Sequence, residues 1–160
     1  MIEMFKNINS HIRSLFDFVR IIDPISNSVV DQAYKGDSGV KCYEMWNNKG
    51  LCKNCIGARA YNYADKSFVK IEYDKDNIYL VMAKSIKCKN RKYVLEAIKD
   101  VTKSSILDGI TKMTNERMQE EVDRMNMLVA LDGLTECFNR RYIIEKLPIE
   151  MAKAIKYKKN

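Results

Sequence analysis

Three of the five cysteines lie within one stretch of fourteen residues, CYEMWNNKGLCKNC, at Cys42, Cys52 and Cys55. A Cys-x-x-Cys turn brings two sulfurs within reach of one ion, and a third cysteine ahead of the turn can supply a third ligand. Zn²⁺ suits a thiolate cluster of this kind, and an iron–sulfur cluster would usually take four cysteines. The spacing therefore predicts a metal site, with zinc as the favoured ion.

A zinc site needs a fourth ligand. Cys88 is favoured because it ends a predicted strand within the same part of the chain, on the face of Ile86 and Met82. His11, the only histidine, comes second, and a water or small ligand would occupy the position otherwise. Cys137 lies much further along the chain and is expected to be a buried apolar thiol. Attached c-type haem is not expected, because Ile56 rather than histidine follows Cys55.

Two interpretations without a metal stay open. Cys52 and Cys55 would form and break a disulfide as a redox pair, or the thiols would simply pack in the core. An odd number of cysteines argues against a closed disulfide framework. The start of the chain lacks the order of a signal peptide, and no window approaches eighteen apolar residues. We therefore expect a cytoplasmic protein that does not enter a membrane.

Aromatic residues flank the cysteines, and they are the candidates for lining a ligand cavity: Tyr43, Trp46, Tyr61 and Tyr63. Packing in the core is the alternative, because aromatic side chains dominate core burial in small domains.

The 160 residues carry 28 Lys and Arg against 21 Asp and Glu, a net charge of +7. This balance allows a second function, a zinc-stabilised basic nucleic-acid-binding protein. The cations are interleaved with acids, however, and only the tail AKAIKYKKN is markedly basic. Without a nucleic-acid motif, we expect no nucleic-acid partner. The chain also shows no phosphate loop, paired-carboxylate motif or histidine-activated nucleophile, so we expect no enzyme activity.

The elements around the cysteines predict an α+β fold with a five-stranded antiparallel sheet. Apolar runs and alternating patterns place strands near 17–23, 28–34, 67–74, 77–88 and 92–102. The cysteine region between the second and third strands contains several glycines and little periodicity. It is expected to form short helices and loops that cover one face of the sheet.

Amphipathic helices are expected on both sides of the sheet, over residues 1–15 and 104–131. The second helix carries an apolar stripe at Ile106, Ile110, Met113, Met118, Val122, Met125 and Val129. The step of five residues between Met113 and Met118 breaks the heptad, which predicts an imperfect coiled coil and a homodimer through the flanking helices. The alternative is a lone amphipathic helix folded against the sheet.

This order of elements resembles the PAS sensor domain. Two strands, short helices and three strands end in IKDVT, and Asp100-Val101-Thr102 is similar to the triplet that closes the last PAS strand. The resemblance covers residues 16–103 and implies a domain that receives a signal, such as a small ligand, a metal or a change in redox state. The CYE segment followed by Cys-x-x-Cys also resembles a pattern in PAS domains of bacterial signalling proteins.

The stretch LDGLTECFNRRYIIEKL resembles the entry to GGDEF diguanylate cyclase domains. Six positions fit that motif: Asp132, Leu134, Thr135, Asn139, Arg140 and Arg141. Glu136 and Cys137 replace the usual Gly-Leu, and no two glycines are adjacent anywhere, so the catalytic loop is absent. Residues 132–160 are therefore interpreted as the truncated start of a GGDEF domain, inert as a cyclase because it lacks a metal–carboxylate site.

Together these features predict a cytoplasmic sensory module of a diguanylate cyclase that acts in cyclic-di-GMP signalling. It would pass a ligand, metal or redox signal through a dimeric helix by a shift between two helix arrangements.

Overall fold

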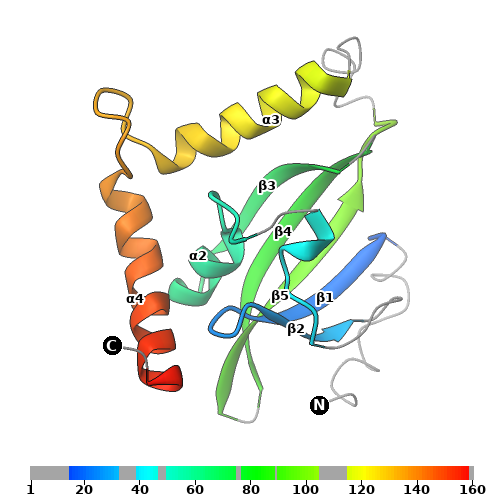
Figure 1. Ribbon diagram of the computed structural model, residues 1–160. Helices are drawn as coiled ribbons and strands as arrows, with labels where there is room; N and C mark the ends of the chain where they lie inside the picture. Colours follow the sequence, from blue (N-terminus) through cyan, green and yellow to red (C-terminus); the bar gives the residue numbers. More distant parts are fainter. Residues whose placement is uncertain are drawn as a thin grey trace.

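The computed structural model describes residues 15–32, 39–46, 50–74, 77–88, 90–104 and 115–158 (Figure 1). The strands are β1 (Phe18–Asp23), β2 (Ser28–Gln32), β3 (Ser67–Asp74), β4 (Asn77–Cys88) and β5 (Arg91–Asp100). The helices are α2 (Ile56–Asn62), α3 (Asn115–Ala130) and α4 (Arg140–Tyr157), with a short 3-10 helix η2 at Glu44–Trp46. The predicted N-terminal helix lies outside the described residues, apart from its last residue.

The five strands form one sheet in the order β2-β1-β5-β4-β3, and every neighbouring pair is antiparallel. The predicted α+β class and the five-stranded antiparallel sheet are thus confirmed. Two tight turns set this register, since Asn27 and Asn90 adopt left-handed φ values of 54° and 64° at the β1–β2 and β4–β5 connections. Asparagine tolerates this conformation better than most residues.

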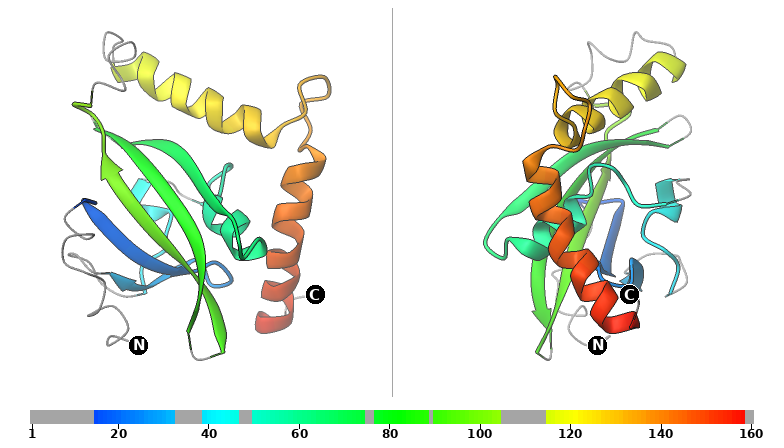
Figure 2. Two further views of the ribbon diagram at one scale, coloured as in Figure 1. Left: turned by 180° about the vertical axis from the view of Figure 1, so that it is seen from behind. Right: turned by 60° about the vertical axis from the view of Figure 1, so that its left-hand side comes forward.

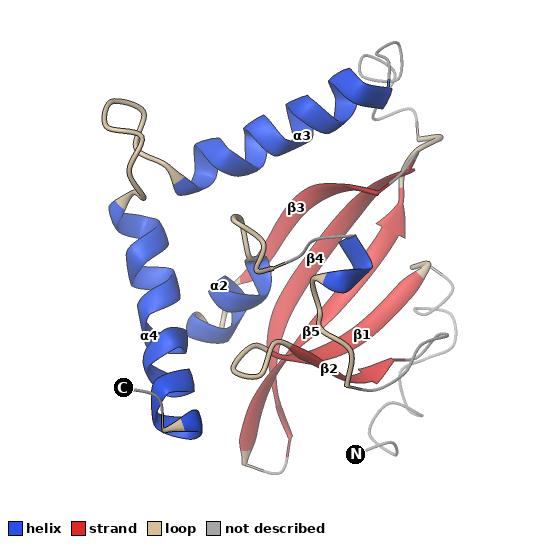
Figure 3. Cartoon of the chain, viewed as in Figure 1, coloured by secondary structure: helices blue, strands red, loops and turns tan. Residues whose placement is uncertain are grey.

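The segment between β2 and β3 covers one face of the sheet (Figure 3). Ile22, Val81, Val94 and Ile98 project from the strands into a buried cluster, and η2 and α2 supply its other side. Trp46, Ile56 and Ala60 are the helical members of that cluster. The prediction that the cysteine-bearing segment covers one face is therefore confirmed, and apolar burial between these layers supplies the main stabilisation.

Charged residues also face this helical layer. Arg20 of β1 lies opposite Glu96 of β5, and its Nε and Nη2 atoms contact Glu96 Oε2 at 2.8 and 2.7 Å. Lys70 and Glu72, two residues apart on β3, form a second buried ion pair. Residues two apart on a strand share a face, so Lys70 and Glu72 point to the same side of β3. Both ion pairs lie close enough to Cys42 or Cys52 to influence their thiols. Four charges are therefore buried in two compensated pairs.

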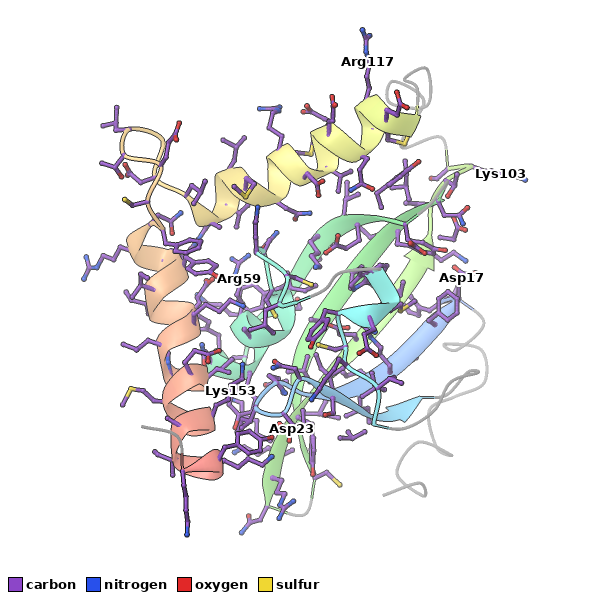
Figure 4. All side chains as sticks on the ribbon, viewed as in Figure 1. Asp17, Asp23, Arg59, Lys103, Arg117 and Lys153 are labelled. Carbon is purple, nitrogen blue, oxygen red and sulfur yellow. The ribbon has the colours of Figure 1, made fainter. Side chains whose placement is uncertain are left out.

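Helix α3 packs against β3 beyond this core. Met118 and Val122 are buried against Tyr73 and Ile78, whereas Arg117 points away from the sheet (Figure 4). Met125 is 41% exposed and Val129 is half-buried. The first half of the predicted coiled-coil stripe, at Ile106, Ile110 and Met113, lies outside the described residues. Where it is described, the helix therefore lies on the sheet of its own chain, with part of its stripe still exposed.

A sharp corner connects α3 to α4, which then runs beside α2 (Figure 2). Helix α4 begins after its N-cap Asn139, whose side chain accepts a hydrogen bond from Tyr142 N. Among the helices in the described part of the chain, none combines the length and apolar character that crossing a membrane requires.

The Arg20–Glu96 pair gives the first prediction. Glu96→Gln leaves a buried guanidinium without its countercharge, which should lower the free energy of unfolding by about 3 kcal/mol or more. Glu150→Gln is the matched control, because the Glu150–Lys153 pair is half exposed and should change stability by less than about 1 kcal/mol. Urea denaturation of the three proteins measures both effects. Equal stability of the two variants would show that the buried pair does not hold the sheet and helical layer together.

Candidate functional site

The three clustered cysteines sit where the segment between β2 and β3 crosses the sheet. Cys42 follows a short stretch that pairs with β2, and its backbone N–H donates to Asn27 O at 2.8 Å. Cys55 is the N-cap of α2, and its Sγ accepts from Ala58 N at 3.4 Å. Cys42 is buried, while Cys52 and Cys55 are half-buried, and none of the three is in a disulfide. Two well-defined elements therefore hold the outer members of the cluster.

Gly57 lets α2 approach the sheet closely enough to place Cys55 there. A Cβ atom at Gly57 would lie only 2.7 Å from Ile22 Cδ1, a distance that real Cβ atoms essentially never show. The same position lies 3.4 Å from Glu96 Oε1 and 3.9 Å from Cys55 Sγ. Cys55 and Glu96 are therefore neighbours across this contact, and the Glu96 carboxylate is one of the two acidic groups, with Glu72, that the sheet places beside the thiols.

Burial raises the pKa of two of the three clustered thiols. Burial raises the pKa of Cys42 from 9.0 to about 12, and the nearby Cys55 and Glu96 add to the rise. Burial also raises the pKa of Cys52, although Lys70 opposes it. Both thiols are therefore protonated at neutral pH in the metal-free protein. Since the thiolate is the nucleophile and the metal ligand, binding a metal here must release protons.

Lys70 lies beneath Cys52 and keeps its charge despite its burial. Burial lowers its pKa, but Cys52 and Glu72 raise it more, so that the pKa ends above its ordinary value. Because Cys52 is itself neutral at neutral pH, Glu72 is the partner that holds the Lys70 ammonium there. The sheet thus supplies a fixed cation next to the sulfur of Cys52, which favours its thiolate once a proton is lost.

The predicted metal ligands are only partly brought together. Cys42, Cys52 and Cys55 share one region, but no three Cys, His, Asp or Glu side chains of the described ranges converge closely enough to hold a metal ion. A shared ion therefore requires these side chains to turn toward a common point. Cys88 ends β4, and strand alternation puts it on the face opposite the core residues Val81 and Ala83. His11 lies outside the described residues.

The aromatic candidates occupy several places. Trp46 is 6% exposed in the core cluster and its ring lies 5.7 Å from that of Tyr79, with Tyr43 packed nearby. Tyr61 packs on the same cluster and takes a cation–π contact from Lys92, and Tyr63 packs on Phe68. The contacts of Tyr43 and Trp46 match the core-packing alternative, whereas Tyr61 also lines a cavity of about 480 Å³.

Polar side chains join the cysteine segment to both C-terminal helices. Asn54, between Cys52 and Cys55, donates from Nδ2 to Asn126 Oδ1 of α3 at 3.0 Å, and Asn126 donates in turn to Ile71 O of β3. Arg59 of α2 pairs with Glu145 of α4 at 3.0 Å (Figure 4). The segment between β2 and β3 is therefore in direct polar contact with both α3 and α4.

The residues of the GGDEF-like motif build the corner between these helices. Asp132 Oδ1 accepts from the backbone of Leu134 and Thr135 and from the Thr135 hydroxyl, which closes the turn. Asn139 Nδ2 donates to Val129 O and Leu131 O, and Arg141 donates to Val129 O. Arg140 is the first residue of α4. The motif therefore satisfies the last carbonyls of α3 while it starts α4.

Helix α4 turns its polar side toward α2 and its apolar side outward. Glu145 and Ile149 are buried. The outward residues are between 47% and 79% exposed: Ile143, Ile144, Leu147, Met151 and Ile155. A continuous apolar face of this size on a surface helix is typical of an interaction surface. Cys137, predicted to be buried, is exposed at the corner that precedes it.

No protein-family model matches the chain, and no curated protein matches it in sequence. The functional argument therefore depends on the fold and on the contacts of the cysteine segment.

Sequence reasoning missed the charged layer beneath the cysteines. Lys70 and Glu72 alternate with Val69 and Ile71 on β3, a pattern that identifies a strand without showing which face is buried. In the structure Val69 is 52% exposed, whereas Lys70 and Glu72 are each 8% exposed. Arg20, with apolar residues on both sides in β1, was the other available signal, since a charge in such a setting needs a partner across the sheet.

The second prediction concerns pH. Because the pKa of Cys42 is higher in the folded than in the unfolded protein, its contribution is complete below pH 9 and is lost as pH rises from 9 toward 12. At pH 10 the chelator-treated protein should have lost about 1.4 kcal/mol through this residue. Urea unfolding at pH 7 and pH 10 measures the loss.

The control is Cys42→Ser, because the serine hydroxyl at position 42 does not titrate in this pH range. Cys52 and Lys70 titrate in both proteins, so the difference between the two pH dependences isolates Cys42. An equal loss in both proteins would contradict the burial of a protonated thiol at Cys42.

Proposed function

We propose that the chain is a cytoplasmic sensory and regulatory module of the PAS type, which controls a diguanylate cyclase and acts as a homodimer. The observation that carries the proposal is the polar connection between the cysteine segment and the C-terminal helices. Asn54 and Arg59 lie on either side of Cys55 and bond to Asn126 of α3 and Glu145 of α4. The segment that would receive a signal therefore contacts both helices that would pass it on.

The order of elements supports the PAS part of the proposal. Two strands, a helical segment over one face and three longer strands follow one another as in that family. Thr102, in the triplet that ends β5, caps the sheet: its Oγ1 accepts from Ile78 N at 2.9 Å and donates to Asp100 Oδ1 at 2.6 Å. The triplet thus fixes the point where the chain leaves the sheet toward α3.

The outward apolar face of α4 supports the second part of the proposal, the connection to a GGDEF domain. In the proposed full-length protein this helix begins a GGDEF domain, whose remainder would cover that face. The chain itself is proposed to have no cyclase activity, because it lacks the acidic residues and glycine loop that would hold Mg²⁺ and the guanine nucleotide.

We propose that the signal acts at the thiols, and that Zn²⁺ is the ligand favoured by their chemistry. Cys42, Cys52 and Cys55 would supply three thiolates. The position of Cys88 on the opposite face of β4 favours a fourth ligand other than cysteine. The raised pKa of Cys52 weakens the redox alternative, because a protonated thiol is a poor nucleophile.

The arrangement of charge favours a sensor over a nucleic-acid-binding protein. Lys and Arg side chains on both strands and helices pair with carboxylates in the described residues, and they do not form one basic stripe. The paired cations are Arg20, Arg59, Lys70, Lys99, Arg124, Lys153 and Lys156. Nucleic-acid binding that weakens steeply with salt would instead support the alternative.

The third prediction tests the metal. Protein purified without chelators should hold about one Zn²⁺ per chain, because structural zinc sites bind one ion. Cys52→Ser should lose most of the metal, whereas Cys137→Ser and Cys88→Ser should retain it, since neither residue lies with the cluster. Elemental analysis gives the metal content of each. Wild-type protein without metal, with an unchanged melting temperature after chelation, would exclude the zinc site.

The fourth prediction tests the connection to α3. Adding Zn²⁺ to the metal-free protein should slow amide exchange in residues 115–130 by about fivefold, the lower range of typical coupling between sites. Asn126→Ala should remove this effect on α3 but leave the slowing within the cysteine segment. Hydrogen–deuterium exchange with mass spectrometry resolves both regions.

Arg117→Ala is the control, because Arg117 lies on the same helix and points away from the sheet. It should behave like the wild type. If metal binds to the wild type but amide exchange in α3 does not change, the proposed coupling between the cysteine segment and α3 is contradicted, although the metal site is not. Light scattering that shows a monomer at high concentration would contradict the dimeric form of the proposal.

A further inference from the structure

Glu96 places a carboxylate in the central strand of the sheet, on the face that the cysteine segment covers. It lies on β5 opposite Arg20 of β1, and it is 5% exposed. Both contacts with Arg20 use one carboxylate oxygen, Oε2, which lies 2.8 Å from Arg20 Nε and 2.7 Å from Arg20 Nη2. In the described part of the chain, no hydrogen bond or ion pair engages the other oxygen, Oε1. The buried ion pair therefore leaves one acceptor atom free.

This free oxygen lies on the side of the thiols. Glu96 Oε1 and Cys55 Sγ lie 3.4 and 3.9 Å from the same point, the position that a Cβ atom would take at Gly57. Burial raises the pKa of Cys42 and of Cys52, and Glu96 adds to both rises. Glu96 therefore lies near Cys55 and within electrostatic range of the other two thiols of the cluster.

Two other glutamates near the cluster are placed less favourably. Glu72 lies on β3 at the edge of the sheet, and it adds to the raised pKa of Cys52 after burial, but not to that of Cys42. Glu150 of α4 lines a narrow gap beside Cys42, but it is exposed. Glu96 is the one of the three that is buried in the central strand and acts on both Cys42 and Cys52.

We propose that Glu96 Oε1 is the fourth ligand of the metal ion bound by Cys42, Cys52 and Cys55. Carboxylate oxygens ligate Zn²⁺ alongside thiolates. Rotation of the carboxylate brings Oε1 to the ion while Oε2 stays on Arg20, and such a partner behind a ligand orients it. Arg20 also offsets part of the negative charge that three thiolates and a carboxylate bring to one ion. The inference rests on the proposed zinc site, and it extends that site from the cysteine segment into the sheet.

Zinc X-ray absorption on the Zn²⁺-loaded wild-type chain counts the ligands by element. Three sulfurs at about 2.3 Å and one oxygen at about 2.0–2.2 Å are expected. Four sulfurs would overturn the inference and leave the zinc site standing. A chain that binds no zinc would overturn both, so the two failures are distinguishable.

Infrared spectroscopy tells whether the oxygen belongs to Glu96 or to water. The chain is labelled with ¹³C in its glutamate carboxyl groups, and the spectrum of the metal-free protein is subtracted from that of the Zn²⁺-loaded protein. Metal coordination changes the separation of the two carboxylate stretching bands, so Zn²⁺ should shift the bands of one glutamate. Glu96→Gln should remove this signal. Glu72→Gln and Glu150→Gln are the matched controls and should retain it.

Glu96→Gln should also weaken Zn²⁺ binding by about tenfold or more, because loss of an outer-shell partner alone costs about that factor. Competition with a coloured chelator measures the affinity, and circular dichroism shows whether the variant folds. If it does not fold, the labelled wild type still decides, since a spectrum in which Zn²⁺ shifts no glutamate overturns the inference. A signal that persists in folded Glu96→Gln, or that disappears in either control, would overturn it as well.

Discussion

The packing of the helical layer on the sheet depends on the buried ion pair between Arg20 and Glu96. Arg20 also donates to Met45 Sδ at 3.4 Å, and its guanidinium lies 5.7 Å from the Trp46 ring, so the pair joins two strands to η2. Glu96 Oε1 faces α2 at Gly57. A compensated pair at the junction of sheet and helical layer fixes their relative position, because moving either layer would leave a charge unpaired in the interior.

Fixing these layers also fixes the chemistry of the thiols. Cys55 caps a helix that can approach the sheet only because residue 57 has no Cβ, and Cys42 is buried at the other end of the segment. Two carboxylates beneath the thiols disfavour their ionisation, whereas Lys70 and Arg20 favour it. Cys42 and Cys52 are thus neutral at neutral pH and surrounded by charges of both signs, and a bound cation would shift that balance.

Most of the fold was predictable from the sequence, because alternating patterns and turn residues are local signals. The five strands, their antiparallel pairing and the helical cover over one face follow from such signals. The partners of Arg20 and Lys70, and whether Cys88 faces the core, were not predictable, since they depend on which face of each strand is buried. One residue of register decides this, and the alternation of β3 fits both choices until α2 is placed. The PAS and GGDEF assignments remain predictions that resemblance supports.

Helices α3 and α4 are connected by side-chain contacts to the sheet, to the cysteine segment and to α2. Asn126 is bonded both to the cysteine segment and to β3, so α3 can leave the sheet only if both contacts break. Glu145 ties α4 to α2, and the Asp132–Asn139–Arg141 corner joins the two helices rigidly. We propose that loss of the Asn126 contacts, together with release of Met118 and Val122 from the sheet, would move α3 and α4 together. The outward apolar face of α4 would move with them, which makes the docking of α3 the step at which a signal could change what that face contacts.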